Sequence, residues 1–172
     1  MSDSRSKAES EDAAPSSAVA QLALARDRRD TGEPDAALCL ADECLCQSLK
    51  RRLPLVELQV QVLRSELLCE LGRTDEAEAS AYRALELAWK MRLEDQKVLC
   101  AISLGRILVE SGRRKGLRTL GRARQMALEN FPDYAKAAEE LIRRVSKRPP
   151  SGADAPPRDI IADPPAQEIP PG

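Results

Sequence analysis

Residues 65–87, SELLCELGRTDEAEASAYRALEL, decide the fold. This stretch predicts two amphipathic helices joined by a tight turn at Gly72, because glycine readily adopts the left-handed backbone that ends many helices. The same turn signal occurs at Gly32 and Gly112, so the three glycines are 40 residues apart (72 − 32 = 40 and 112 − 72 = 40). A constant period of this length is typical of stacked helical hairpins. The sequence therefore predicts an all-α protein built from three such hairpins.

Helical spacing of apolar residues supports this prediction. The segment before Gly72 places Val56, Val60, Leu63 and Leu67 three or four residues apart, which predicts one buried helix face. The expected helices are residues 18–30, 34–51, 54–71, one starting at residue 75, 93–111, 113–129 and 132–146. The last of these is expected to cap the array, which would otherwise expose its final apolar face.

Composition divides the 172 residues into three parts. Residues 1–16 have no apolar period and predict a disordered N-terminal arm. Residues 17–147 carry the helical repeats. Residues 148–172 contain eight prolines and predict a disordered tail with polyproline II character. A docking peptide centred on residues 158–161 is the alternative interpretation of this tail.

Charge is unevenly distributed, although the net charge is only −1. Residues 111–148 contain 11 basic and 4 acidic residues, whereas the rest of the chain contains 16 basic and 24 acidic ones. Five cysteines without an apolar signal segment suggest reduced thiols inside a cell. No run approaches the roughly 18–20 apolar residues that a membrane span needs, so we expect a cytoplasmic protein that does not contact a membrane.

The small residues around the three glycines resemble the tetratricopeptide repeat, in a long variety of about forty residues instead of the usual 34 or so. The matching columns are Ala25, Ser65 and Gly105; Ala37, Ala77 and Leu117; and Cys44, Ala84 and Arg124. The third repeat departs from the pattern, and a one-residue slip would restore Leu120, Ala123 and Ala127 to the packing columns. The resemblance implies a right-handed superhelix in which the first helix of each hairpin lines a concave groove.

The groove that the resemblance implies has a regular charge pattern. Each repeat carries two charged residues four apart, hence on one helix face: Arg26 with Asp30, Glu66 with Glu70, and Arg106 with Glu110. One interpretation is a set of ion pairs on a solvated face. The other is an acidic groove with arginine at its edges, which binds a basic or mixed peptide. The full set of groove positions is Arg26, Asp30, Gln59, Val62, Glu66, Glu70, Ile102, Arg106 and Glu110.

A basic patch follows Gly112. Its residues are Arg113, Arg114, Lys115, Arg118 and Arg122, with Arg124 and the basic residues between 143 and 148 as an extension. Three interpretations follow: a solvated face that contacts the acidic first repeats, a site for an anion or an acidic protein, and a nucleic-acid site. The patch has no interleaved aromatic residues, which base stacking requires, so a nucleic-acid partner is the weakest of the three.

Residues for catalysis and metal binding are scarce. The chain has no histidine, which removes the commonest general base and most mixed zinc sites. Cys44 and Cys46 lie about 200° apart on a helix and cannot chelate one ion from one face. No phosphate-binding glycine loop and no nucleophile elbow occur. We therefore predict no catalytic residues, no metal and no cofactor, and a protein that is not an enzyme.

The function predicted from these features is that of a non-catalytic adaptor or scaffold that binds a protein or peptide segment in its groove, as part of a regulatory complex. The alternative is a nucleic-acid-associated transcriptional regulator that uses residues 113–148. A small helical enzyme is a third hypothesis, which would need a pocket with strongly shifted carboxylates. Because three repeats are close to the minimum for independent folding, the sequence is also compatible with a homodimer formed through an end face.

Overall fold

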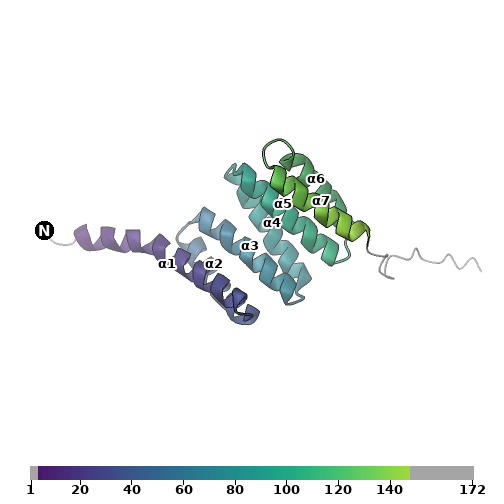
Figure 1. Cartoon of the computed structure of the whole chain (residues 1–172). Coiled ribbons are helices and arrows are strands. Elements are labelled where there is room, and N and C mark those ends of the chain that lie inside the picture. The colour runs from purple at the N-terminus through teal and green to yellow at the C-terminus, as the bar shows by residue number, and fades with distance from the viewer. Residues whose placement is uncertain (1–3, 148–172) are drawn as a thin grey trace, which may run out of the picture.

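The structure is a computed structural model that describes residues 4–147 of the chain, with side chains described from residue 17. The described residues form seven helices and no strand, which confirms the all-α prediction (Figure 1). The helices are α1 (Ser4–Asp30), α2 (Pro34–Lys50), α3 (Pro54–Glu70), α4 (Thr74–Lys90), α5 (Glu94–Glu110), α6 (Lys115–Ala127) and α7 (Pro132–Ser146).

The central helices are equal in length and equally connected. Helices α2 to α5 each contain 17 residues, and residues 51–53, 71–73 and 91–93 join them. In each of the five connections between α1 and α6, one residue has a positive φ. These residues are Gly32, Gly72 and Gly112, as predicted, and also Arg52 and Arg92. The chain therefore reverses every 20 residues with one kind of turn, and only alternate turns use glycine.

Each of these turns closes with the same two backbone hydrogen bonds. After α3, the N–H of Gly72 donates to the carbonyl of Cys69 (3.0 Å) and the N–H of Arg73 donates to the carbonyl of Leu68 (2.8 Å). This is the Schellman arrangement, which satisfies the last helical carbonyls and needs one left-handed residue. Arg52 and its neighbour Leu53 make the equivalent bonds after α2 (3.2 and 2.9 Å).

The helices pack in chain order and form two layers. Each helix contacts the next one, and each odd-numbered helix also contacts the next odd-numbered helix. No contact between even-numbered helices occurs among the described residues. Because neighbouring helices are antiparallel, the glycine turns lie along one edge of the array and the turns after α2, α4 and α6 lie along the other (Figure 1).

Small residues fill the contacts between helices. The buried columns are Ala37, Ala41, Cys44 and Ser48 in α2; Ala77, Ala81, Ala84 and Ala88 in α4; and Gly116, Leu120, Ala123 and Ala127 in α6. The second column follows the first by 40 residues, and the third follows the second by 39. The predicted one-residue slip is therefore confirmed. Leu117, which the unslipped alignment placed in the core, is 41% exposed.

Glycine lets α5 and α6 approach more closely than alanine would. A Cβ on Gly105 would lie 2.7 Å from Cγ of Leu120, and a Cβ on Gly116 would lie 2.6 Å from the backbone nitrogen of Val109. The equivalent residues in the second repeat are Ser65 and Ala77, both buried. Helix α7 then packs on α6 and α5, with Ala135 beside Val98 and Ala127.

The ends of the chain differ from the prediction or lie outside the described residues. Helix α1 begins at Ser4 and not at residue 18, so residues 4–16 are helical where a disordered arm was expected. Alanine, glutamate and lysine in this segment have high helix propensity and extend the helix without an apolar period. Residues 148–172 lie outside the described part, and so does the peptide at 158–161. None of the helices described has the length and apolar character needed to cross a membrane.

Candidate functional site

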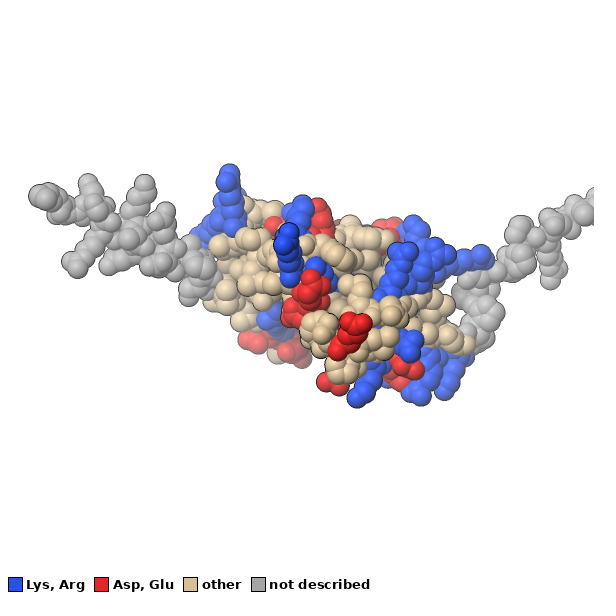
Figure 2. All heavy atoms as spheres, turned by 90° about the horizontal axis from the view of Figure 1, so that it is seen from above, with Lys and Arg blue, Asp and Glu red and all other residues tan. Residues whose placement is uncertain are grey.

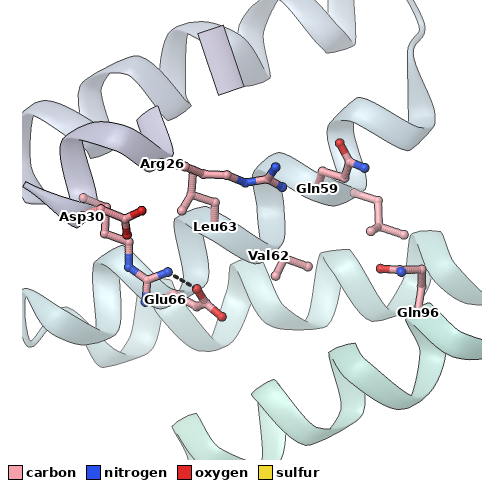
Figure 3. A pocket seen from close by; sticks show the side chains of 9 residues that line it. Arg26, Asp30, Gln59, Val62, Leu63, Glu66 and Gln96 are labelled. Atoms are coloured by element: carbon pink, nitrogen blue, oxygen red, sulfur yellow. Dashed lines mark hydrogen bonds and ion pairs between the residues drawn. The ribbon is translucent and has the colours of Figure 1, made fainter. Parts of the chain in front are cut away.

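Two adjacent hollows lie on the layer formed by α1, α3 and α5. The first has a volume of about 370 Å³ and is lined by Arg26, Arg29, Asp30, Leu58, Gln59, Val62, Leu63, Glu66 and Gln96 (Figure 3). The second has a volume of about 380 Å³ and is lined by Glu66, Ile102, Ser103, Arg106, Ala137, Glu140, Leu141 and Arg144. Glu66 belongs to both, so the two hollows meet at this residue.

Most of the predicted groove residues line this surface. Arg26, Asp30, Gln59 and Val62 line the first hollow, Ile102 and Arg106 line the second, and Glu66 lies between them. Glu70 and Glu110 line neither. The sequence prediction did not include Arg29 or Gln96 of the first hollow, nor the α7 residues of the second.

The charged groups that α1, α3 and α5 contribute to this surface pair across helices, whereas Glu140 and Arg144 pair within α7 (3.1 Å). Arg29 of α1 donates to Glu66 and to Glu70 (2.6 Å from Nη2 to Oε1), both on α3. On the other side of Glu66, Arg106 of α5 lies 3.8 Å away. The expected pairs Arg26–Asp30 and Arg106–Glu110 do not form among the described residues; Arg106 faces Glu66, and Glu110 accepts a hydrogen bond from Cys69.

These pairs favour the charged form of Arg29. Burial opposes the charged form of Arg29, but hydrogen bonds from its guanidinium to Glu70 and Glu66, together with the attraction of both carboxylates, raise its pKa overall. Glu66 therefore lies between two cations, and its charge is largely balanced within the chain. The open charges of the first hollow are Arg26 and Asp30, neither of which has an ion-pair partner in the described part of the chain.

Cys69 and Glu110 make the next contact along the same layer. The Cys69 thiol donates to Oε2 of Glu110 at 2.9 Å. Burial, followed by this hydrogen bond and the carboxylate charge, raises the pKa of Cys69 to about 11. The thiol is therefore protonated near neutral pH and is a poor nucleophile.

The predicted basic patch separates into paired and unpaired residues. Arg113 forms ion pairs with Asp75 and with Glu78 (3.1 Å), both on α4, and Arg124 lies 3.4 Å from Glu139 on α7. Arg114 also has interactions within the chain. Lys115, Arg118 and Arg122 are exposed and have no ion-pair partner among residues 17–147. In Figure 2, Lys and Arg side chains crowd toward the end of the array that leads to residues 148–172.

The remaining ionisable groups offer little reactive chemistry. Among the described residues no three metal-ligating side chains are grouped closely enough to hold an ion. Cys44 and Cys100 are buried, whereas Cys39 and Cys46 are exposed. Glu140 in the second hollow has a lowered pKa, because Arg144 and Arg143 donate hydrogen bonds to it. A carboxylate of this kind stays ionised and is a weak proton donor.

The arrangement as a whole offers an apolar floor, amide groups and balanced charges, without a reactive centre that the described residues place together. Comparison with known proteins gives no independent assignment: no protein-family model matches the chain, and neither the curated proteins nor the solved structures include a significant match.

Proposed function

We propose that this protein is a non-catalytic adaptor that binds an extended segment of a partner protein along α1, α3 and α5, in the cytoplasm. The observation that carries this proposal is the pair of hollows joined at Glu66. Together they follow the direction in which the helices stack. A linear segment can occupy both, whereas a compact small molecule would be enclosed by neither.

The proposed architecture is a right-handed superhelix like that of the tetratricopeptide repeat. The 40-residue period and the two layers support it. Odd-numbered helices contact one another while even-numbered ones do not, so successive helices are closer together in the odd layer. The layer with the closer spacing would form the concave side. A curved array of this kind presents an extended binding surface on its inner side.

The chemistry of the first hollow suits a peptide. Val62 is partly exposed and, with the buried Leu58 and Leu63, forms an apolar floor that can receive an aliphatic side chain. Gln59 and Gln96 lie on the side of the hollow away from Asp30 (Figure 3), and an amide side chain can both donate to and accept from a peptide backbone. Arg26 and Asp30 supply one unpaired charge of each sign, which favours a segment of mixed charge.

The test is affinity purification of the full chain followed by mass spectrometry. Val62→Glu places a charge on the apolar floor and is expected to abolish capture of the partner. Ala79→Glu introduces the same residue on an exposed position of α4 and is expected to leave capture intact. A second variant, Arg26→Glu with Asp30→Lys, reverses two exposed charges and does not threaten folding. Capture of the same proteins by all variants, or of none by the native chain, would contradict the proposal.

A nucleic-acid-associated regulator is the second candidate. Lys115, Arg118 and Arg122 favour it, because they lie at positions i, i+3 and i+7 on one exposed helix face and have no partner in the described residues. Phosphate contacts release counterions, so this function predicts a binding constant that falls steeply with salt. Absence of binding to duplex and single-stranded DNA and RNA at low salt would exclude it.

A further inference from the structure

The two edges of the array differ in how many of their charged side chains are paired within the chain. Along the glycine edge, the charged residue that follows each glycine is paired within the chain. Glu33 lies 2.8 Å from Arg28, Arg73 lies 2.7 Å from Glu76, and Arg113 lies 3.1 Å from Glu78. Along the opposite edge Lys90 pairs with Glu86 (2.6 Å) and Arg51 has an interaction within the chain, but Lys50, Arg52 and Arg92 have no ion-pair partner in the part of the chain that the structure describes.

The turns of this opposite edge also have an unfavourable backbone. Arg52 and Arg92 have φ values of 55° and 56°, in the left-handed region that disfavours residues with a side chain. Glycine occupies the equivalent position in the three turns of the other edge. The turn itself therefore does not require arginine, and non-glycine residues with a left-handed backbone are found preferentially at functional sites.

Exposed apolar side chains accompany both arginines. Leu49 and Trp89 occupy equivalent positions at the ends of α2 and α4, and they are 52% and 55% exposed. Leu55, in the first turn of α3, is also 52% exposed. One face of the Trp89 ring is covered by the Lys97 ammonium at 4.4 Å from the ring centre. Lys97 is buried and bonded to Glu94 (2.5 Å), so it holds the indole in place and leaves the rest of the ring open.

The result is a repeated pair of sites, which we name the arginine edge. The first site consists of Leu49, Lys50, Arg52 and Leu55, and the second consists of Trp89 and Arg92. Each site contains an exposed apolar side chain and, within a few residues of it, a guanidinium without an ion-pair partner in the described residues. Both lie on the edge where α2 and α4 end, in successive repeats, and this edge is distinct from the layer that carries the two hollows (Figure 1).

We propose that the arginine edge binds an acidic protein segment that presents a carboxylate beside an apolar side chain twice along its length. The planar guanidinium matches a carboxylate through two parallel hydrogen bonds, and this explains why arginine occupies both left-handed positions. An anionic membrane or a nucleic acid fits less well. Glu86 and Glu94 are balanced by Lys90 and Lys97. Asp95 has no ion-pair partner among the described residues and would repel a continuous polyanion, whereas a segment with separated acidic groups can avoid it.

The test uses the full chain and a fluorescein-labelled acidic amphipathic peptide made of Glu, Leu and Ala, measured by anisotropy. Trp89 is the only tryptophan, so its emission reports contact independently and is expected to shift to shorter wavelength. The variant Arg52→Gly/Arg92→Gly is expected to weaken binding by about tenfold or more. It replaces strained residues with glycine, and its thermal midpoint is expected not to fall.

Arg28→Ala/Arg73→Ala is the matched control, because it removes the same charge from the glycine edge, where the two exposed arginines pair with Glu33 and Glu76. It is expected to leave peptide affinity within about twofold of the native value. An equal loss in both double variants would overturn the proposal, since net charge alone would then explain binding. Binding of phosphatidylserine vesicles or poly-deoxythymidine that depends on Arg52 and Arg92, without binding of the peptide, would also overturn it.

Discussion

Cys69 and Glu110 repeat, one repeat later, the contact that joins Arg29 to Glu70. In both pairs the first residue belongs to an odd helix and the second lies 41 positions further, in the next odd helix. Arg29 faces two carboxylates, Glu66 and Glu70. The residues equivalent to these in the next repeat are Arg106 and Glu110, so a cation at position 69 would meet Arg106. A neutral thiol donor satisfies Glu110 without that repulsion.

The first prediction concerns thiol reactivity. Because Cys69 has a pKa of about 11, at pH 8 it should react with iodoacetamide about 100-fold more slowly than an unperturbed thiol. Cys39 and Cys46 are exposed and should react first. Cys44 and Cys100 are buried and should react only on unfolding. Time-resolved alkylation with peptide mass spectrometry measures this order. Labelling of Cys69 as fast as Cys46 would show that its contact with Glu110 does not hold in solution.

The second prediction concerns alkaline pH. Burial raises the pKa of Cys100 to about 11 from 9.0, and Cys69 has a similar value. A raised pKa means that the folded state holds the thiol proton more tightly than the unfolded state. The resulting stability is complete below pH 9 and is lost as the pH rises toward 11. The urea midpoint of the native chain should therefore fall over this range.

Lysine and tyrosine also titrate at alkaline pH, so a control is needed. Cys69→Ala/Cys100→Ala should show a smaller fall in the urea midpoint between pH 9 and 11 than the native chain does. Parallel curves for the two proteins would assign the whole effect to other groups and contradict the prediction.

The third prediction compares two turns of the same geometry. Gly72 has a φ of 73° and no atom within 4 Å of an added Cβ, so Gly72→Ala tests backbone strain alone. It should reduce the free energy of unfolding by about 1 kcal/mol. Arg92→Gly makes the opposite change at a φ of 56° and should leave stability unchanged or raise it by up to about 1 kcal/mol. Chemical denaturation measures both, and a gain for Gly72→Ala would contradict the assigned turn.

The sequence was sufficient for the glycine turns because glycine marks a left-handed residue directly. Arg52 and Arg92 carry no such mark, and their conformation depends on the packing of α2 against α3 and of α4 against α5. Their place halfway between the glycines was the one signal that could have found them. The slipped register of α6 was predictable, because Leu120, Ala123 and Ala127 keep helical spacing.

The candidate site was predictable only in part. Offsets from each glycine identified one helix face, and Arg26, Gln59, Val62 and Glu66 of that face line the first hollow. They could not identify ion-pair partners, because pairing depends on the separation of α1, α3 and α5 in space. Arg29 was missed for this reason. The α7 side of the second hollow was missed as well, because α7 does not continue the 40-residue pattern.

The fourth prediction tests whether Arg29 is a structural residue of this layer. Arg29→Gln leaves Glu66 and Glu70 without their main cation. It should reduce the free energy of unfolding by about 1 kcal/mol, since the three side chains are only partly buried. In a chain that already carries Glu66→Gln, Arg29→Gln should reduce the free energy of unfolding by less, because one partner of Arg29 is already neutral. A double-mutant cycle by urea denaturation measures this coupling. Strict additivity of the two losses would mean that the pair contributes nothing to stability.

The fifth prediction contrasts two glycines of α6. A Cβ at Gly116 would lie 2.6 Å from the backbone nitrogen of Val109 and 3.0 Å from the carbonyl oxygen of Gly105, and backbone atoms cannot move aside as a flexible side chain would. Gly116→Ala should therefore cost about 2 kcal/mol or more. Gly121 lies in the same helix with nothing within 4 Å, so Gly121→Ala should gain up to about 1 kcal/mol from helix propensity. Opposite shifts of the thermal midpoint are expected. If both variants were stabilised, α5 and α6 would have to lie further apart than the structure places them.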